Sequence, residues 1–421
     1  MEKNIIYLTQ SYPSDIYSEK NFITPELESL RKEFKKIVLL PIVDEGHSLG
    51  YENNLPEGVT VDWSLAHDKT LKSYVRRLSY LFHPFVRWSF SEMKGEAHGL
   101  RQWIKGYYQA ANTVHIADII RRVALRHGFT PDNTLLHSMW FHDSGHAIAY
   151  MSSHEGWHSA SHAHTSDIYD DRMLFRSRRI RNELLKHLDF LMPISRNGHD
   201  YLCTRFPERK AGIVHSPLGS IRLFEPHPER KQYSPKHLTF VTVARLDPIK
   251  RLDLIMELLH SMSLRLPGTK ITWTLIGDGH CMEQLQQKGR QLMTADFTVE
   301  MKGMMENEDI QRYYATGAPD WFILMSSSEG VPVSMGEAMS YGIPVITTDV
   351  GEVKELADDT CAILLPRDAT VKEYTDMILQ AITSVDIQPV MSAAAMKKWD
   401  TTFNASRFAS EITSRLSHLF D

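Results

Sequence analysis

The chain has 421 residues, with 42% apolar and 24% charged side chains and a formal net charge of −5. This length exceeds what one hydrophobic core usually organises, so we expect two domains of roughly 200 residues each. The acidic balance argues against a nucleic-acid partner, and no apolar run approaches the roughly 20 residues that a membrane span needs.

The first half of the chain alternates strand-like and helix-like segments. Strands are expected at 5–8, 37–40, 135–140 and 190–194, and helices at 25–33 and 146–151. The stretch 69–126 differs, because it has helical character and no convincing strand. We therefore expect a Rossmann-like domain over residues 1–225 that carries a helical insertion at about 66–130.

The composition shifts to Pro, His, Lys and Arg at 226–235, which we interpret as a linker. After it, strands are expected at 238–244, 271–276, 297–301, 321–325, 343–347 and 361–365, with helices at 252–263, 282–292, 310–315 and 371–382. Such alternation implies right-handed crossovers and a parallel sheet. The predicted fold class is α/β, with a second Rossmann-like domain over 226–395, a cleft between the two sheets, and a C-terminal helix, 396–421, that packs back on the first domain.

Two carboxylates, Glu329 and Glu337, stand seven residues apart between the predicted strands 321–325 and 343–347. A short helix over 334–341 is expected between those strands, because Gly342 and Pro344 end it. Loops at the carboxyl ends of parallel strands line the ligand crevice, so both acids should face one pocket beside a helix N-terminus that favours an anion.

Two cations follow the first strand of the second domain. Arg245 falls at the strand end and Lys250 where the next helix begins, a pattern suited to a diphosphate. A solvated basic turn is the alternative interpretation. Gly277 starts a glycine-rich turn that is either a phosphate loop or a plain tight turn, and Gly303 with Met304 either contacts a base or simply ends a strand.

These residues occur in the order and spacing of family-4-type retaining glycosyltransferases, and the block EGVPVSMGEAMSYGIPVITTDVGEVKEL resembles the donor-site signature of that family. The resemblance covers nearly all of 238–360 and implies the GT-B fold of two Rossmann-like domains. It implies that Glu329 contacts hydroxyls of the transferred sugar and that Glu337 holds the ribose hydroxyls. Arg245 and Lys250 would neutralise the diphosphate. The donor-site set is completed by a phosphate cradle of backbone amides from about Gly330 to Ser334, a stretch that includes Val331, Pro332 and Val333; Pro332 itself has no N–H to donate.

Fixed cations and helix amides stabilise the charge that grows on a departing nucleoside diphosphate, so the resemblance implies no cofactor and no catalytic metal. The sequence also lacks an Asp-x-Asp element of the kind that metal-dependent transferases use.

Seven histidines lie between His137 and His164. His142 and His146 have the i, i+4 spacing of a helical metal pair, but Asp replaces the expected Glu after the first histidine and a glycine interrupts the turn. Surface or capping histidines are the ordinary case, and we predict no metal site here.

His164 and Asp167 resemble the first-domain motif of exopolysaccharide-type members, in which a histidine at a strand end approaches the donor sugar across the cleft. The alternative is a strand-end histidine bonded to nearby backbone. The loop after the first strand, 9–15, lacks the glycines that family members often carry, which weakens any phosphate role for it.

The stretch 69–126 contains 11 Lys or Arg and 3 Asp or Glu, with interleaved aromatic residues. Such a region either lies on anionic lipid or is an ordinary helical face whose aromatics are core. Three widely separated cysteines and a start without a signal peptide indicate a cytoplasmic location, or one on the inner face of the membrane.

The leading hypothesis is a retaining glycosyltransferase that uses a UDP- or GDP-sugar and a saccharide or lipid-linked saccharide acceptor in surface polysaccharide synthesis. Nucleotide-sugar epimerases or hydrolases share this architecture, and a membrane-associated non-catalytic homologue is a third class. A phosphorylase would need a cofactor lysine and a longer chain. Intact Arg245, Lys250, Glu329 and Glu337 argue against the non-catalytic class.

Overall fold

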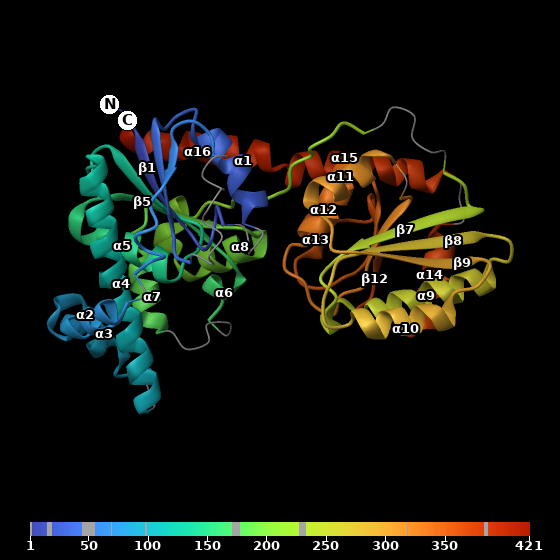
Figure 1. Ribbon diagram of the computed structural model, residues 1–421, viewed down its shortest axis with the longest axis horizontal. Coiled ribbons are helices and arrows are strands. Elements are labelled where there is room, and N and C mark those ends of the chain that lie inside the picture. Colours follow the sequence, from blue (N-terminus) through green and yellow to red (C-terminus); the bar gives the residue numbers. More distant parts are fainter. Residues whose placement is uncertain are drawn as a thin grey trace. The chain divides into compact units, whose positions relative to one another are not determined.

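The computed structural model describes residues 2–14, 19–43, 55–68, 70–96, 99–170, 177–226, 233–317, 319–382 and 386–421. It divides into two units, one of residues 1–218 with 405–421 and one of residues 219–404. Each unit contains one six-stranded sheet in which neighbouring strands pair in parallel. The α/β class and the two parallel sheets predicted from the alternating pattern are therefore confirmed (Figure 1).

The first unit has the strand order β3-β2-β1-β4-β5-β6. Its strands are β1 Asn4–Thr9, β2 Lys36–Pro41, β3 Val59–Val61, β4 Thr134–Ser138, β5 His158–Ala163 and β6 Phe190–Pro193. Its helices are α1 Lys20–Leu30, α2 Leu71–Ser79, α3 Pro84–Met93, α4 Leu100–His127, α5 Asp143–Glu155, α6 Thr165–Ile168, α7 Arg178–Leu185, α8 Arg196–Arg205 and α16 Ala405–Ser417. The short strand β3 and helices α7 and α8 were not predicted, because none of them shows a long periodic apolar pattern.

Alternation along the strands divides the apolar side chains of this sheet between its two faces. Ile6 and Leu8 pack with helices such as α4 and α5, whereas Ile5 and Tyr7 pack on the opposite side with α1 and α16. The C-terminal helix α16 lies against α1, as predicted for a helix that returns to the first domain (Figure 1).

The second unit has the strand order β12-β11-β10-β7-β8-β9. Its strands are β7 His237–Val243, β8 Lys270–Ile276, β9 Phe297–Gly303, β10 Trp321–Leu324, β11 Val345–Thr348 and β12 Ala362–Leu365. Its helices are α9 Leu252–Arg265, α10 Met282–Leu292, α11 Asn307–Ala315, α12 Val333–Ser340, α13 Val353–Leu356, α14 Val371–Ile382 and α15 Ile387–Thr402. Most of the predicted linker, 227–232, lies outside the described residues.

Two apolar clusters cover the faces of the second sheet. Trp273 and Leu275 belong to the cluster under α9 and α14, and Phe322 belongs to the cluster under α12 and α15. The sheet order places the ends of β7 and β10 side by side, so the loops that follow these two strands meet. Among the helices that the structure describes, none is both long enough and apolar enough to cross a membrane.

Candidate functional site

The loop after β10 presents Glu329 just before helix α12. Oε1 of Glu329 accepts hydrogen bonds from Ser326 and from the ammonium of Lys250, whose Nζ lies 2.5 Å away. Only 10% of the Glu329 side chain and 19% of the Lys250 side chain are exposed, so this ion pair is screened less than a surface pair. The structure thus brings together the acid and one of the two cations that the sequence singled out.

Lys250 is positioned by its neighbour Arg251, which sequence reasoning overlooked. Arg251 has a left-handed backbone with a φ of 49°, and its guanidinium donates to the carbonyl oxygens of Ser326 at 3.1 Å and of Arg367 at 2.9 Å. These bonds tie the turn after β7 to the loop after β10. A single arginine in a charged run gives no local signal for that role, because its acceptors are backbone atoms distant in sequence.

Arg245 has a different environment. Its side chain is 75% exposed and forms an ion pair with Asp247 two residues later. Asp247, at 17% exposure, is therefore a further charged group at this turn that the sequence analysis did not weigh.

The turn at Gly277 approaches the same segment through its backbone. A Cβ on Gly277, whose φ is 138°, would lie 1.9 Å from the carbonyl oxygen of Ala244, and one on Gly279 would lie 2.8 Å from that of Leu246. Only glycine permits this contact, which brings the loops after β7 and β8 together. Gly303 ends β9 with a φ of 70° and open space around it, and Met304 beyond it is 76% exposed.

Glu337 lies at the middle of α12 and is 5% exposed. Its Oε1 accepts a 2.7 Å hydrogen bond from Nδ2 of Asn307, the first residue of α11. Burial raises the pKa of Glu337 to about 7, against the opposing effect of the Asn307 hydrogen bond. Gln311 in turn donates to Oδ1 of Asn307 at 2.8 Å, so the carboxylate has a fixed polar support.

Helix α12 begins at Val333 after the N-cap Pro332, and the first amides of a helix have no acceptor within it. Gly330 is exposed, Val331 and Val333 are half-buried, and Pro332 is buried. The preceding loop is held from the other side by Gly351, where a Cβ would lie 1.8 Å from the carbonyl oxygen of Glu329. Gly351 has a φ of 56° and lies within the block that resembles the donor-site signature, although no role was predicted for it.

His164 and Asp167 lie at the start of α6 in the first unit. Nε2 of His164 is 3.0 Å from the carbonyl oxygen of Met139, and the imidazole stacks on Trp140 with ring centroids 3.7 Å apart. Burial lowers the pKa of His164 to about 4, so this imidazole is neutral at physiological pH. The Asp167 carboxylate accepts from the amides of His164 at 3.1 Å and Phe141 at 3.2 Å.

The loop after β1 binds a carboxylate of the chain itself. The amides of Gln10, Ser11 and Tyr12 donate to Glu19 over 2.9 to 3.1 Å, and Nε1 of Trp140 donates to the same carboxylate at 2.9 Å. Glu19 is 3% exposed. These amides form an anion-binding loop without glycine, and the Glu19 carboxylate is the anion that it holds. Residue 15, the last of the predicted loop, lies outside the described residues.

The histidines between His137 and His164 do not act as one group. His154 contacts the carbonyl oxygen of Tyr150 and His158 pairs with Asp189. In the part of the chain that the structure describes, three metal-ligand atoms converge only at Glu26, His137 and His162. The predicted helical pair, His142 and His146, is not part of that group.

Comparison with known proteins identifies the second unit. Residues 237–384 match the family model described as "Glycosyl transferases group 1". The amylovoran biosynthesis glycosyltransferase AmsK of Erwinia amylovora is 27% identical over 60% of this chain and 63% of its own length. WcaL of Escherichia coli K12, provisionally named a colanic acid biosynthesis glycosyltransferase, is 26% identical over 56% of this chain and 58% of its own. The matches therefore span less than two thirds of these curated relatives.

Solved structures resemble the chain over its whole length. HepE of Anabaena, solved in complex with UDP, superposes with a TM-score of 0.66 at 16% identity over 99% of this chain and 100% of that chain. At this identity the likeness concerns the fold, which is the predicted GT-B fold. Residues 237–384 of this chain thus form a glycosyl transferase group 1 domain within a GT-B fold.

Proposed function

We propose that this chain is a retaining glycosyltransferase of surface polysaccharide synthesis, which moves a sugar from a UDP- or GDP-sugar to a saccharide or lipid-linked saccharide acceptor. The observation that carries the proposal is the Lys250–Glu329 ion pair beside the start of α12. It couples a cation suited to a diphosphate with a carboxylate suited to sugar hydroxyls. The group 1 domain and the names of AmsK and WcaL support the assignment to polysaccharide synthesis.

In the proposed donor complex, Lys250 and the solvent-facing Arg245 contact the diphosphate together with the first amides of α12. Glu329, released from Lys250, accepts hydrogen bonds from hydroxyls of the transferred sugar. Glu337, held by Asn307, accepts them from the ribose. The UDP in the HepE structure supports a uridine nucleotide as the first donor to test.

Catalysis then follows from positioning and charge. The bond between the anomeric carbon and the phosphate oxygen breaks while an acceptor oxygen attacks the same face of the sugar, and the acceptor proton passes to the leaving phosphate. Cations fixed in a partly buried site stabilise the developing diphosphate charge without a catalytic metal. His164 and Asp167 are proposed as the contribution of the first unit to sugar binding.

If the acceptor is lipid-linked, α2 and α4 are proposed to contact the membrane that holds it. Apolar side chains form exposed stripes at helical spacing on these helices: Leu71, Tyr74, Val75 and Leu78 on α2, and Leu100, Ile104 and Tyr108 on α4, each between 48% and 81% exposed. Phe82, just after α2, is 85% exposed. By contrast, Phe85 and Tyr80 are core, so some aromatic residues of this region are buried and others are exposed, as the proposed lipid-facing surface requires. Lys69 lies outside the described residues.

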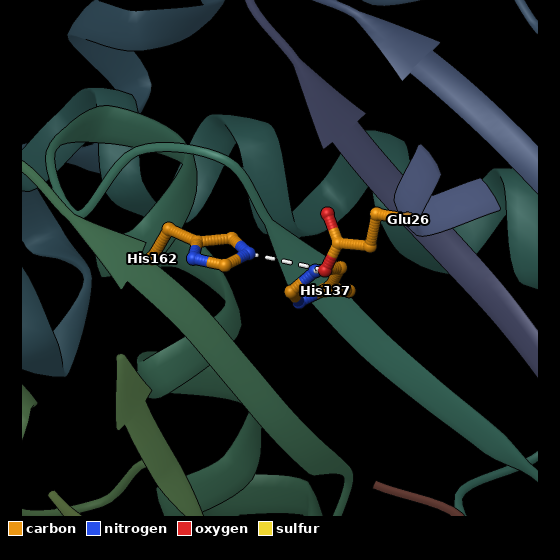
Figure 2. A group of neighbouring side chains, drawn as sticks. All are labelled: Glu26, His137 and His162. Atoms are coloured by element: carbon orange, nitrogen blue, oxygen red, sulfur yellow. Dashed lines mark hydrogen bonds and ion pairs between the residues drawn. The ribbon is translucent and has the colours of Figure 1, made fainter. Parts of the chain in front are cut away.

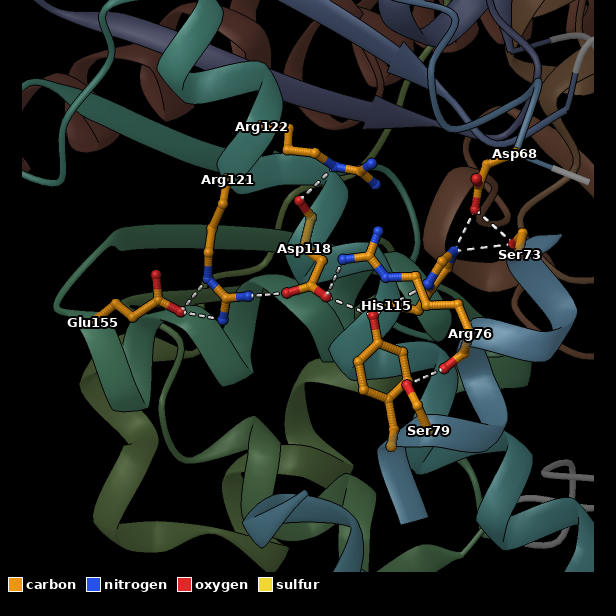
Figure 3. Close-up of polar contacts among 10 residues, drawn as sticks. Asp68, Ser73, Arg76, Ser79, His115, Asp118, Arg121, Arg122 and Glu155 are labelled. Carbon is orange, nitrogen blue, oxygen red and sulfur yellow. Dashed lines mark hydrogen bonds and ion pairs between the residues drawn. The ribbon is translucent and has the colours of Figure 1, made fainter. Parts of the chain in front are cut away.

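A polar network joins α2 to α4 and α4 to α5 (Figure 3). Asp118 of α4 pairs with Arg76 of α2 at 3.2 Å and also with Arg121, which reaches Glu155 of α5 at 2.6 Å. His115 of α4 and Ser73 of α2 share Asp68. The exposed apolar side chains of α2 and α4, together with the basic composition of 69–126, make an anionic lipid surface the proposed partner.

A donor screen followed by product analysis tests the proposed activity. Thermal shift against UDP-, GDP- and ADP-sugars should single out one nucleotide, since a ligand at 100 times its Kd stabilises a protein by about 2.7 kcal/mol. Transfer to a saccharide acceptor in EDTA should then give a product with the donor's anomeric configuration by NMR. Inverted product contradicts retention, and nucleotide release without transfer or with an epimerised sugar indicates the hydrolase or epimerase alternative.

A further inference from the structure

A buried carboxylate in the first unit meets two imidazoles (Figure 2). Oε1 of Glu26 lies 3.0 Å from Nε2 of His137 and 3.0 Å from Nε2 of His162. The three ligand atoms all lie within 4.8 Å of one another. Exposure is 6% for Glu26, 0% for His137 and 3% for His162, so the group is removed from solvent.

Three elements build this group. His137 is on β4 and His162 on the neighbouring β5, where the register pairs His137 with Ala160 and so puts both histidines on the same face of the sheet. Glu26 is on α1, among the apolar residues Ile23, Leu27 and Leu30 that pack on that face. A glutamate at such a position is costly to bury unless a positive centre compensates its charge.

The hydrogen bonds of His137 indicate where a compensating positive charge must lie. Nδ1 of His137 lies 3.1 Å from the carbonyl oxygen of Ala160, which can only accept, so Nδ1 carries a proton. In the neutral ring, Nε2 then directs a lone pair at the Glu26 carboxylate. A cation between these two atoms resolves the conflict, and it is either a proton or a metal ion.

The surroundings have the features of a metal site. Histidines that bind a metal through one ring nitrogen usually donate a hydrogen bond from the other, often to a backbone carbonyl such as that of Ala160. A carboxylate that binds a metal through one oxygen is likewise often hydrogen-bonded at its other oxygen. Tyr7 supplies the latter bond, 2.5 Å from its hydroxyl to Oε2 of Glu26. Nδ1 of His162 is buried and has no partner among the residues that the structure describes.

A small cavity also adjoins two of the three residues. It has a volume of about 20 Å³ and is lined by Glu26 and His162 together with Phe22, Ser216 and Ala409. This is room for one water molecule. Two histidines, one glutamate and a water complete a tetrahedral zinc coordination, whose ligand atoms lie about 3.3 Å apart for bonds of about 2.0 Å.

We propose that Glu26, His137 and His162 bind a divalent transition metal, zinc by donor type, with water as the fourth ligand. The site joins α1 to β4 and β5 and so stabilises the first unit. It is separate from the residues to which the donor site is assigned, and it stands whether or not the proposed transfer activity is found.

Metal analysis of the tag-free full chain tests the proposal. Protein expressed with added zinc and gel-filtered should contain about one zinc per chain by mass spectrometry. Glu26→Gln and His137→Gln should each lower this content at least about fivefold, since each removes one of only three protein ligands. His199→Gln is the matched control, because His199 lies 3.4 Å from Cys203 in a half-exposed pair that could bind metal adventitiously.

Circular dichroism shows whether each variant folds. If one does not, cobalt substitution of the unaltered chain tests the same site without a mutation. Refolding with Co²⁺ should give the visible bands of tetrahedral cobalt without a sulfur-to-metal charge-transfer band, because no cysteine belongs to the site. Zinc content below about 0.1 per chain after refolding in excess zinc would show that a proton bridges the group. Metal lost in His199→Gln but kept in Glu26→Gln would assign it to the adventitious pair.

Discussion

Lys250 and Glu329, 79 positions apart in the chain, form a 2.5 Å ion pair whose two members come from the loops after β7 and β10. In this state each side chain neutralises the charge of the other. A ligand that carries both an anion and hydroxyl donors can replace both halves of the pair at once, whereas a ligand with only one of these groups leaves a partly buried charge uncompensated.

Glu329→Ala, Lys250→Ala and Arg245→Ala should each lower kcat/KM for transfer by about 100-fold or more, because each removes a group expected to act on the sugar or the departing diphosphate. The Lys250→Ala/Glu329→Ala double variant should lose less than the product of the single effects, since the two residues share one interaction.

Arg265→Ala is the control for these substitutions, because Arg265 forms an exposed pair with Asp376 on α9 and α14. It should retain nearly full activity. Near-normal turnover in Glu329→Ala, with circular dichroism unchanged, would rule out the donor-site assignment.

Glu337→Gln should raise stability above pH 7 and leave it unchanged near pH 4. Burial raises the pKa of Glu337 to about 7 from an ordinary value of 4.5, so between these values the folded state binds more protons than the unfolded state. The destabilisation therefore develops as pH rises through this window and is complete above it. Its removal is worth at most about 3 kcal/mol, measurable by urea unfolding at both pH values.

Glu337→Gln should also reduce the change of nucleotide affinity with pH. Ribose hydroxyls donate to the ionised carboxylate, so UDP affinity of the unaltered chain should increase from pH 5.5 to 8 relative to Glu337→Gln. The variant serves as the reference that cancels titration of the phosphate itself. Parallel calorimetric profiles for the two proteins would contradict a ribose contact.

Gly351→Ala should displace the Glu329 loop. A Cβ there would lie 1.8 Å from the carbonyl oxygen of Glu329 at a backbone φ of 56°, so both steric overlap and left-handed strain oppose it. We expect a loss of more than about 2 kcal/mol in stability together with weakened donor binding.

Gly268→Ala separates the two causes, because Gly268 has a φ of 78° but open space around its Cβ position. It should cost only about 1 kcal/mol and leave donor affinity unchanged. Equal effects at the two glycines would mean that the contact with Glu329 is not what requires glycine at 351.

Glu19→Ala should destabilise the first unit by about 3 kcal/mol or more, because three backbone amides and the Trp140 indole lose their shared buried acceptor. Chemical unfolding followed by tryptophan fluorescence measures this loss. Glu28→Ala, an exposed position on the same helix α1, should change stability by less than about 0.5 kcal/mol. If Glu19→Ala matches it, the loop does not depend on its internal anion.

Leu78→Ser/Phe82→Ser should reduce binding to vesicles that contain anionic lipid, since both side chains belong to the exposed apolar surface of α2 and its following turn. Flotation at low and high salt measures the effect, and binding of the unaltered chain should also fall with salt. Leu264→Ser, an exposed apolar residue on α9, is the matched control. Flotation that is unchanged by salt and by the double substitution would reject a membrane-facing role.

Most elements of the second unit are predictable from local sequence patterns. Strands there carry compact apolar runs, as in β10, or alternating apolar residues, as in β9, and the helices α10 and α14 have the predicted bounds because periodicity and turn residues are local signals. The block around Glu329 and Glu337 likewise resembles a donor loop from its residues alone. Short or polar-flanked elements of the first unit, such as β3, gave no such signal.

Which side chains meet depends on how the whole chain packs. Arg245 pairs with Asp247 while Lys250 pairs with Glu329, Glu19 fills the anion loop after β1, and the histidines that group with a carboxylate are His137 and His162 instead of His142 and His146. These partnerships depend on strand order, register and burial, which arise from packing between distant segments. Local periodicity does not specify these contacts, so the chemistry of the sites follows only from the folded chain.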